Sequence, residues 1–266
     1  MRLAVSTWSL SYMSLDEAIR TIKRLGVDVV EILLDEPHLR PADMSSKMLL
    51  RVKELVNSTG LEVIIHAPFL NLNIASADET KRSYSSNLYK RALEVAYTLE
   101  AELITFHPGY PDFPGIYEQS LLLSINTMTK ILDMASQLGV NVAIENMIDT
   151  KREILCVTAE DTLMYLNSLG DRVLLTLDLG HAHIARELYN FIRKLSDVIV
   201  NVHIHDNDGA YDQHLPLGMG TLNYSAALSS LLKHAKGLRY LTIETTPRIG
   251  EEGVVMTIKR LEELIY

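Results

Sequence analysis

Short apolar runs alternate with longer helical patterns along the 266-residue chain, and this alternation limits the possible folds more than any other feature. The runs are typical of buried strands, whereas the segments between them place apolar residues three or four positions apart, as amphipathic helices do. The expected strands are Leu3–Ser6, Val29–Leu33, Glu62–His66, Leu103–Phe106, Asn141–Glu145, Val173–Leu177, Val198–His203 and Tyr240–Glu244. The pattern therefore predicts an α/β fold with a parallel sheet.

The signals at the helix ends agree with this alternation. Ser14-x-x-Glu17 and Ser76-x-x-Glu79 have the spacing of capping boxes and are expected to open two helices. A glycine, which adopts left-handed backbone conformations easily, separates several helical patterns from the next strand. These expected helix-ending glycines are Gly26, Gly60, Gly139, Gly170 and Gly237. Apolar residues also share one face within the expected helices; these are Leu88, Ala92, Val95, Ala96 and Leu99, and then Leu121, Ile125, Met128, Leu132 and Ala135.

Eight strand and helix units predict a (β/α)8 TIM barrel, a fold that typically needs about 250 residues. An open, doubly wound sheet would usually carry a glycine-rich nucleotide loop after its first strand, but Thr7-Trp8-Ser9 stands there. No stretch rich in proline, glycine or serine divides the chain. We therefore expect a single domain over residues 1–266.

Composition excludes several classes of protein. With 47% hydrophobic residues the chain can bury a large core, and a net charge of −9 disfavours general binding to the phosphates of nucleic acid. A single cysteine, Cys156, cannot form an intramolecular disulfide and fits a reducing compartment. Neither a signal peptide nor an apolar stretch of membrane-spanning length is recognisable. We expect a cytoplasmic protein without membrane contact, and the sequence does not indicate its oligomeric state.

Histidine and acidic residues collect where the expected strands end. The segment from His203 to Gly220 holds three histidines and three aspartates directly after an apolar run. Other runs end in or beside His66, His107, Glu145, Asp178 and Glu244. Imidazole and carboxylate groups together suit zinc, manganese or a similar divalent ion. Because the carboxyl ends of all barrel strands meet at one face, we expect these side chains to form a metal site there.

The remaining candidates carry weaker signals. Asp178-Leu-Gly-His181 places an imidazole one turn beyond a carboxylate, so that both can face one cavity. His205 lies two residues beyond His203 and could share its face, but we interpret both His183 and His205 as structural residues that bond to the backbone or face solvent. His38 and His234 are interpreted as surface residues. Trp8 and Phe69 follow the first and third strands, where they could wall the apolar side of a ligand pocket or pack in the core.

Taken together, these motifs resemble the xylose isomerase-like barrel superfamily, which holds sugar isomerases and epimerases as well as the endonuclease IV group. The resemblance rests on His66-Ala-Pro-Phe69, Phe106-His107-Pro-Gly109, Ile144-Glu145-Asn146, Asp178-Leu-Gly-His181, His203-x-x-Asp206, Asp212-x-His214 and Ile243-Glu244. In the isomerase and epimerase branch it implies metal binding by Glu145, Asp178, His203 and Glu244. In the endonuclease IV branch it implies a three-metal site that adds His66, His107, His181, Asp212 and His214.

Departures from both branches narrow the expected activity. Endonuclease IV carries a basic, tryptophan-containing loop after its second strand, whereas this chain has the acidic segment Asp35–Pro41. The usual Ala-Gly-Gln-Gly run after strand five is replaced by Met147–Lys151, and Phe69 stands for the usual tyrosine. Ketose 3-epimerases usually have an arginine several residues after the strand-seven histidine, and Gly209 lies near that place here. Chemistry like that of hydroxypyruvate isomerase or inosose dehydratase stays open.

The resemblance and the two glutamates together lead to a functional hypothesis. The protein is expected to be a sugar isomerase or epimerase that uses a divalent ion, namely zinc, manganese, magnesium or cobalt, on a sugar or sugar phosphate. Glu145 and Glu244 would transfer the proton through an enediolate, and the ion would polarise the carbonyl. The residues expected to hold the substrate are His66, His107, His181, Trp8 and Phe69. The alternative is a zinc-dependent phosphodiesterase like endonuclease IV, in which a metal-bridging hydroxide attacks phosphorus.

Overall fold

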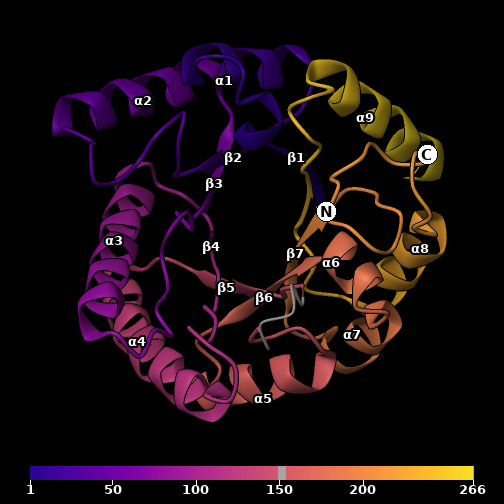
Figure 1. Ribbon diagram of the computed structural model, residues 1–266. Coiled ribbons are helices and arrows are strands. Elements are labelled where there is room, and N and C mark those ends of the chain that lie inside the picture. The colour runs from indigo at the N-terminus through magenta and orange to yellow at the C-terminus, as the bar shows by residue number, and fades with distance from the viewer. Residues whose placement is uncertain (149–153, 266) are drawn as a thin grey trace.

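The computed structural model describes residues 1–148 and 154–265 and shows a closed barrel of parallel strands inside a ring of helices (Figure 1). The strands are β1 (Arg2–Ser6), β2 (Val29–Leu33), β3 (Glu62–His66), β4 (Ile104–Phe106), β5 (Val142–Glu145), β6 (Leu174–Asp178), β7 (Ile199–Ile204) and β8 (Tyr240–Ile243). Each strand pairs with the next along the chain, and β8 closes the barrel on β1. The predicted (β/α)8 barrel is confirmed, with strand ends within one residue of those expected.

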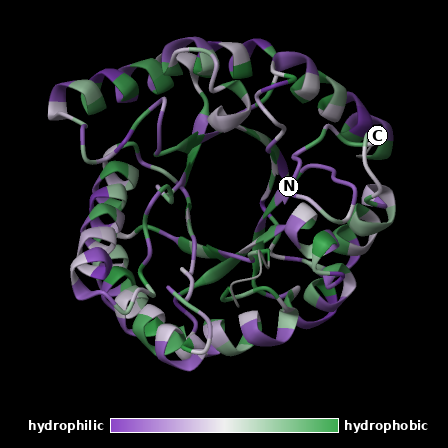
Figure 2. Ribbon diagram, viewed as in Figure 1, coloured by the Kyte–Doolittle hydropathy of each residue, from purple (hydrophilic) through white to green (hydrophobic). Residues whose placement is uncertain are grey.

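Helices cover the outside of the barrel between successive strands (Figure 1). They are η1 (Thr7–Leu10, a 3-10 helix), α1 (Leu15–Arg24), α2 (Ser46–Thr59), α3 (Glu79–Thr98), α4 (Tyr117–Leu138), α5 (Ala159–Leu169), α6 (Leu179–Ile184), α7 (Leu188–Leu195), α8 (Tyr224–His234) and α9 (Glu251–Ile265). Figure 2 shows hydrophobic and hydrophilic residues alternating along these helices. The apolar faces predicted for α3 and α4 are buried, apart from Ile125, which is partly buried. Among the described residues, none of the helices combines the length and apolar character needed to cross a membrane.

One of the two predicted capping boxes is present. The Ser14 hydroxyl accepts from the backbone N–H of Glu17, and the Glu17 carboxylate accepts from the backbone N–H of Ser14. The prediction for Ser76 and Glu79 is wrong, because Asp78 caps α3 by accepting from the N–H groups of the first turn. The Ser76 hydroxyl instead donates to Asp112 at 2.7 Å, a partner 36 residues away.

The predicted helix-ending glycines behave differently from one another. Gly60 and Gly139 end α2 and α4 in the left-handed conformation, and Gly26 also has a positive φ. Gly170 has a φ of 74° but a ψ of −166°, so it ends α5 outside the left-handed helical region. The prediction for Gly237 is wrong, because α8 is already capped at Ala235, whose N–H donates to Leu231 O.

The barrel interior is layered along its axis. Its amino-terminal end is filled by a separate apolar cluster made of Ala4, Val29, Ile64, Leu103, Ala143, Val200 and Tyr240. Above it lie buried polar pairs, in which Thr105 and Thr176 join their hydroxyls at 2.8 Å and the Thr242 hydroxyl donates to the Asn201 amide oxygen. Acidic and histidine side chains follow at the carboxyl-terminal end. The packed lower layers leave this end to carry the site, as in other barrels.

His38 corrects one sequence-based expectation. It was predicted to be a surface residue, but its side chain is buried, with 9% of the residue exposed. The ring Nε2 lies 3.0 Å from Met13 O, and because a carbonyl oxygen only accepts, this nitrogen donates. His234 is exposed as expected.

Candidate active site

His203 brings the four predicted metal ligands together. Its Nδ1 atom lies 3.1 Å from an oxygen of Glu145, 3.5 Å from one of Glu244 and 3.9 Å from one of Asp178. The four residues come from the ends of β5, β6 and β7 and from the position just after β8, and all are buried. One imidazole nitrogen therefore faces three carboxylates that converge from separate strands.

Glu31 completes this group and was not anticipated from the sequence. It lies in the middle of β2, is fully buried, and places Oε2 3.1 Å from Nε2 of His203. The sequence does indicate the direction of its side chain, because side chains alternate along a strand and Val29, Glu31 and Leu33 therefore point to the same side. Val29 belongs to the cluster inside the barrel, so Glu31 had to point inward as well.

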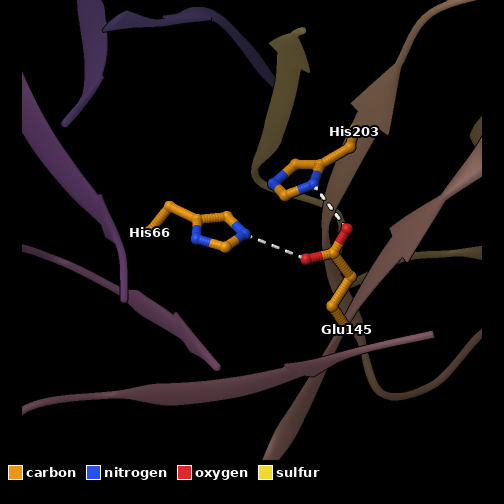
Figure 3. A group of neighbouring side chains, drawn as sticks. All are labelled: His66, Glu145 and His203. Atoms are coloured by element: carbon orange, nitrogen blue, oxygen red, sulfur yellow. Dashed lines mark hydrogen bonds and ion pairs between the residues drawn. The ribbon is translucent and has the colours of Figure 1, made fainter. Parts of the chain in front are cut away.

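Glu145 is shared by several histidines. Its Oε1 lies 3.1 Å from His203 Nδ1, and its Oε2 lies 3.0 Å from His66 Nε2 (Figure 3). The same Oε2 also lies 3.0 Å from His107 Nε2. His66 ends β3 and His107 follows β4, so both histidines reach Glu145 from the two strands that precede β5 in the barrel. The structure thus brings both accessory histidines to the predicted site.

A second group lies beside the first. Asp212 places Oδ2 3.4 Å from His181 Nε2 and 3.1 Å from His214 Nε2. The backbone N–H of His181 donates to Asp178 Oδ1 at 2.7 Å, and this hydrogen bond joins the two groups. The candidate metal-holding sets therefore overlap; they are His66, Glu145 and His203; Glu145, Asp178 and His181; Glu31, His203 and Glu244; and His181, Asp212 and His214.

His205 lies inside the site, which favours the alternative that it shares the face of His203 over its interpretation as a structural residue. It is fully buried, its Nε2 is 3.1 and 3.2 Å from the two oxygens of Asp178, and its ring stacks on His214 at 3.8 Å. It lies two residues after His203 and therefore points to the same inward side, although β7 itself ends one residue earlier, at Ile204. His183 is outside the cluster, as expected, with Nε2 3.0 Å from the Thr221 hydroxyl.

Hydrogen bonds to backbone carbonyls fix which ring nitrogen carries the proton in three histidines. His66 Nδ1 donates to Ala67 O, His181 Nδ1 donates to Asn146 O, and His214 Nδ1 donates to Glu244 O, at 2.8 to 2.9 Å. Because a carbonyl cannot donate, each Nδ1 carries a proton and leaves Nε2 facing a carboxylate. Histidines that bind metals are held in this way, so the donor set fits a divalent ion.

Crowded charge perturbs the carboxylates of the first group. Burial raises the pKa of Glu244 to about 7, and neighbouring Glu31 adds to the effect while His203 opposes it. For Glu145 burial acts in the same upward direction, but the charge of His203 and the hydrogen bond from His107 hold its pKa well below the usual value. The pKa values of Glu145 and Glu244 are thus shifted in opposite directions.

One buried carboxylate shapes the loop that carries Asp212 and His214. Asp206 accepts from the N–H groups of Asn207, Gly218, Gly220 and Leu222 at 2.9 to 3.0 Å. A Cβ atom on Gly220 would lie 2.4 Å from Asp206 Oδ1, so only glycine allows this close approach. The loop folds back over the barrel end because its amides are gathered on Asp206.

These groups lie around one cavity of about 990 Å³, which is at the upper end of the usual range for small-molecule sites. Glu145 and Glu244 are among its lining residues, together with His66, His107, His181, Asp212 and His214. Trp8 and Phe69 also line it, and their rings pack against His214 at 4.6 Å and His107 at 5.0 Å. The cavity therefore combines a polar, acidic floor with apolar walls.

The segment Asp35–Pro41 is less acidic at its surface than its sequence indicates. Asp35 is buried and accepts from the N–H groups of Phe69 and Leu70 at 2.8 and 2.9 Å. Its carboxylate therefore organises the loop that carries Phe69 instead of facing a ligand, and Glu36 is the one acidic residue of the segment that is exposed. Of the other segment used to judge DNA binding, Met147–Lys151, residues 149–151 lie outside the described part of the chain.

An α/β barrel with histidine and carboxylate side chains gathered at the carboxyl ends of its strands is typical of a known class of protein. A model of the xylose isomerase-like TIM barrel family matches residues 19–264, and the chain belongs to this family. It is 31% identical to an uncharacterized protein of Methanocaldococcus jannaschii over 87% of this chain and 79% of the relative.

Relatives named after both activities of the family are found. The chain is 24% identical to fructoselysine 3-epimerase of Escherichia coli O157:H7, over 84% of this chain and 82% of the relative. It is likewise 24% identical to a probable endonuclease 4 of Methanosphaera stadtmanae, over 70% of this chain and 71% of the relative. These identities are equal, so they do not by themselves separate the two activities.

Two solved structures share the fold over the whole chain. A D-tagatose 3-epimerase-like protein superposes with a TM-score of 0.86 and 27% identity, covering 100% of this chain and 97% of its own. The IolI protein, solved with a bound zinc atom, superposes with a TM-score of 0.85 and 19% identity, covering 100% and 98%.

Proposed function

We propose that the protein is a sugar epimerase or isomerase that depends on a divalent metal ion. The observation that carries this proposal is the placement of Glu145 and Glu244, which both line the cavity and both lie within 3.5 Å of the same nitrogen of His203. A sugar held between two such carboxylates can lose a proton to one and regain it from the other, or from the same one.

Glu145, Asp178, His203 and Glu244 would hold the ion in this proposal. Three carboxylates and one imidazole form a donor set that suits zinc, manganese, magnesium or cobalt. When bound, the ion polarises the substrate carbonyl and stabilises the negative charge that develops on neighbouring oxygens. The convergence of three carboxylates on one imidazole nitrogen, at 3.1 to 3.9 Å, supports the binding of a cation there.

The chain's own residues supply the proton transfer and the walls of the pocket. Glu244 lines the cavity, so its carboxylate can reach a bound substrate and act as acid and base at a carbon atom. Glu145 stays ionised because His203 and His107 offset the effect of burial. His66 and His107 would bind substrate oxygens, while Trp8 and Phe69 would cover an apolar side of the sugar.

The similarities support this assignment. The relative from Escherichia coli is named a fructoselysine 3-epimerase, and the solved structure with 27% identity is described as D-tagatose 3-epimerase-like. The IolI structure was solved with a bound zinc atom, which supports metal binding by a barrel of this kind. A cavity of about 990 Å³ leaves room for a sugar that carries a substituent, including a phosphate.

The second group favours one alternative, a phosphodiesterase of the endonuclease IV kind. His181, Asp212 and His214 can hold a further ion, and His66 and His107 point their Nε2 atoms at Glu145. With several ions this arrangement could cleave a phosphate ester. Counting the ions in gently purified protein separates the proposals, because about one per chain is expected for the isomerase and about three for the phosphodiesterase.

Solvent deuterium exchange tests the main proposal directly. Wild type and Glu244→Gln would be incubated in deuterated buffer with ketoses, hydroxypyruvate and inososes, and with an abasic oligonucleotide in parallel. We expect deuterium to enter a sugar carbon and this exchange to fall about 10²- to 10⁴-fold in the variant. Glu252→Gln, at an exposed position in α9, serves as the matched control and should exchange as the wild type does. Rapid metal-dependent cleavage of the oligonucleotide without exchange would reject the proposal.

A further inference from the structure

Glu31 is a buried carboxylate to which the proposed reaction gives no role. It lies inside the barrel on β2 with no exposed surface, and its Oε2 atom is 3.1 Å from His203 Nε2. Its other oxygen, Oε1, has no hydrogen-bond partner within the part of the chain that the structure describes. Burying a carboxylate is costly unless it is paired, so a glutamate here requires the contact to His203.

The His203 ring separates Glu31 from the proposed metal ligands. Its Nε2 atom faces Glu31, while its Nδ1 atom faces Glu145, Asp178 and Glu244 at 3.1 to 3.9 Å. An ionised carboxylate can only accept a hydrogen bond, so Nε2 must carry the proton of that contact. A ring protonated at Nε2 can offer a lone pair only from Nδ1, on the side of the three carboxylates.

We propose that Glu31 is a positioning residue for metal binding, which keeps His203 in its Nε2-protonated form with Nδ1 turned toward Glu145, Asp178 and Glu244. Histidine ligands commonly donate their second N–H to a carboxylate, which orients the ring and makes the ligating nitrogen more basic. The inference rests on the proposed metal dependence, but it does not require the substrate to be a sugar.

The main competing arrangement makes Glu31 itself a ligand. Glu31, His203 and Glu244 offer atoms within 4.8 Å of one another, so an ion could lie on the Nε2 side of the ring. The distribution of carboxylates argues against this, because Nδ1 has three of them within 4 Å, whereas Nε2 forms an ion pair with Glu31 alone among the described residues. The two arrangements predict opposite tautomers of His203.

Nitrogen NMR of the zinc-loaded wild type distinguishes them without any substitution. With ¹⁵N-labelled histidine, we expect the His203 signals of a ring protonated at Nε2 and bound through Nδ1. A ring protonated at Nδ1 and bound through Nε2 would overturn the proposal. Assignment through the loss of one signal set in His203→Gln identifies the residue, and this result holds even where a variant at Glu31 fails to fold.

Zinc affinity of Glu31→Gln, measured by competition with a chelating dye, provides the second test. Glutamine keeps the shape but removes the charge and can donate as well as accept, so it no longer enforces one tautomer. We expect the affinity to fall about 10- to 100-fold. Glu62→Gln, on neighbouring β3 but at the other end of the barrel, is the matched control and should bind as the wild type does.

A folded Glu31→Gln protein with unchanged affinity would reject the role of Glu31. Failure of the proposed function gives a different result. If the wild type shows the expected tautomer and the variant binds weakly, but no sugar is turned over, the positioning role stands and the sugar assignment fails. If the wild type binds no divalent ion at all, both are rejected.

Discussion

Gly180 leaves the space that the His205 ring occupies, since a Cβ atom on Gly180 would lie 2.0 Å from Cε1 of His205. The ring in turn places Nε2 3.1 Å from Asp178, a proposed ligand two residues before the glycine. Glycine in the Asp178-Leu-Gly-His181 motif is therefore explained by a close approach from β7. The glycine of this motif is therefore required by a contact with His205, which directly follows β7.

Gly180→Ala should consequently destabilise the protein. Alanine would normally strengthen a helix such as α6, by about 0.5–1 kcal/mol relative to glycine, so any loss reflects the steric conflict. We expect overpacking to cost about 1–3 kcal/mol in urea unfolding of the metal-free protein. Gly237→Ala is the control, because the nearest atoms to its added Cβ are 3.7 Å away. Equal stability of Gly180→Ala and wild type would contradict this account.

Inward-facing residues show how far the sequence predicts the site. Strand ends could be placed because parallel barrel strands share a direction, and this brought Glu145, Asp178 and His203 to one face. Glu31 was missed because a single polar residue inside an apolar run looks like an interruption of the strand. The alternation from Val29 would have revealed its direction, but not that His203 from β7 meets it.

Contacts between distant segments explain the other errors. Nothing local distinguishes Ser76 from Asp78 as a helix cap, and the choice follows from Asp112, which holds the Ser76 hydroxyl. His38 is buried by its contact with Met13, 25 residues away. Both are tertiary effects, which the spacing of residues in one segment does not contain.

Asp206→Asn should loosen the loop that carries Asp212 and His214. An amide nitrogen in place of one carboxylate oxygen would face backbone N–H groups and leave some of them buried without an acceptor. Each such group costs about 1–3 kcal/mol, so we expect a clear fall in the melting temperature. Asp208→Asn, at an exposed position of the same loop, should cost much less. Similar losses in the two variants would show that Asp206 does not organise the loop.

The buried His38 ring predicts a pH dependence of stability. Burial lowers its pKa, although the bond to Met13 opposes this, so the folded protein resists protonation of the ring. In the unfolded chain histidine takes up a proton near pH 6.5. The unfolded state therefore binds more protons as the pH falls below that value, and the contribution of His38 to stability is lost in acid.

Comparison of wild type with His38→Gln isolates this effect from the other histidines. We expect the stability of the wild type relative to the variant to decline from pH 7 to pH 5, by at most about 1.4 kcal/mol per pH unit. Thermal unfolding at a series of pH values measures it. The exposed His234→Gln serves as control, with a curve that parallels the wild type. A constant difference between wild type and His38→Gln would contradict the prediction.

Asp178 and Asp212 allow the two neighbouring groups to be tested with the same substitution. Asp178 is fully buried beside His203 Nδ1, whereas Asp212 joins His181 and His214 at the cavity wall. If the proposed ligands hold the principal ion, Asp178→Asn should purify with little metal and little activity. Asp212→Asn should keep about one ion per chain and lose less sugar turnover than Glu244→Gln, because it leaves both proton-transfer glutamates in place. Metal content by mass spectrometry and deuterium exchange measure both. Loss of all bound metal in Asp212→Asn, with Asp178→Asn still loaded, would place the principal ion in the His181, Asp212 and His214 group and favour the phosphodiesterase.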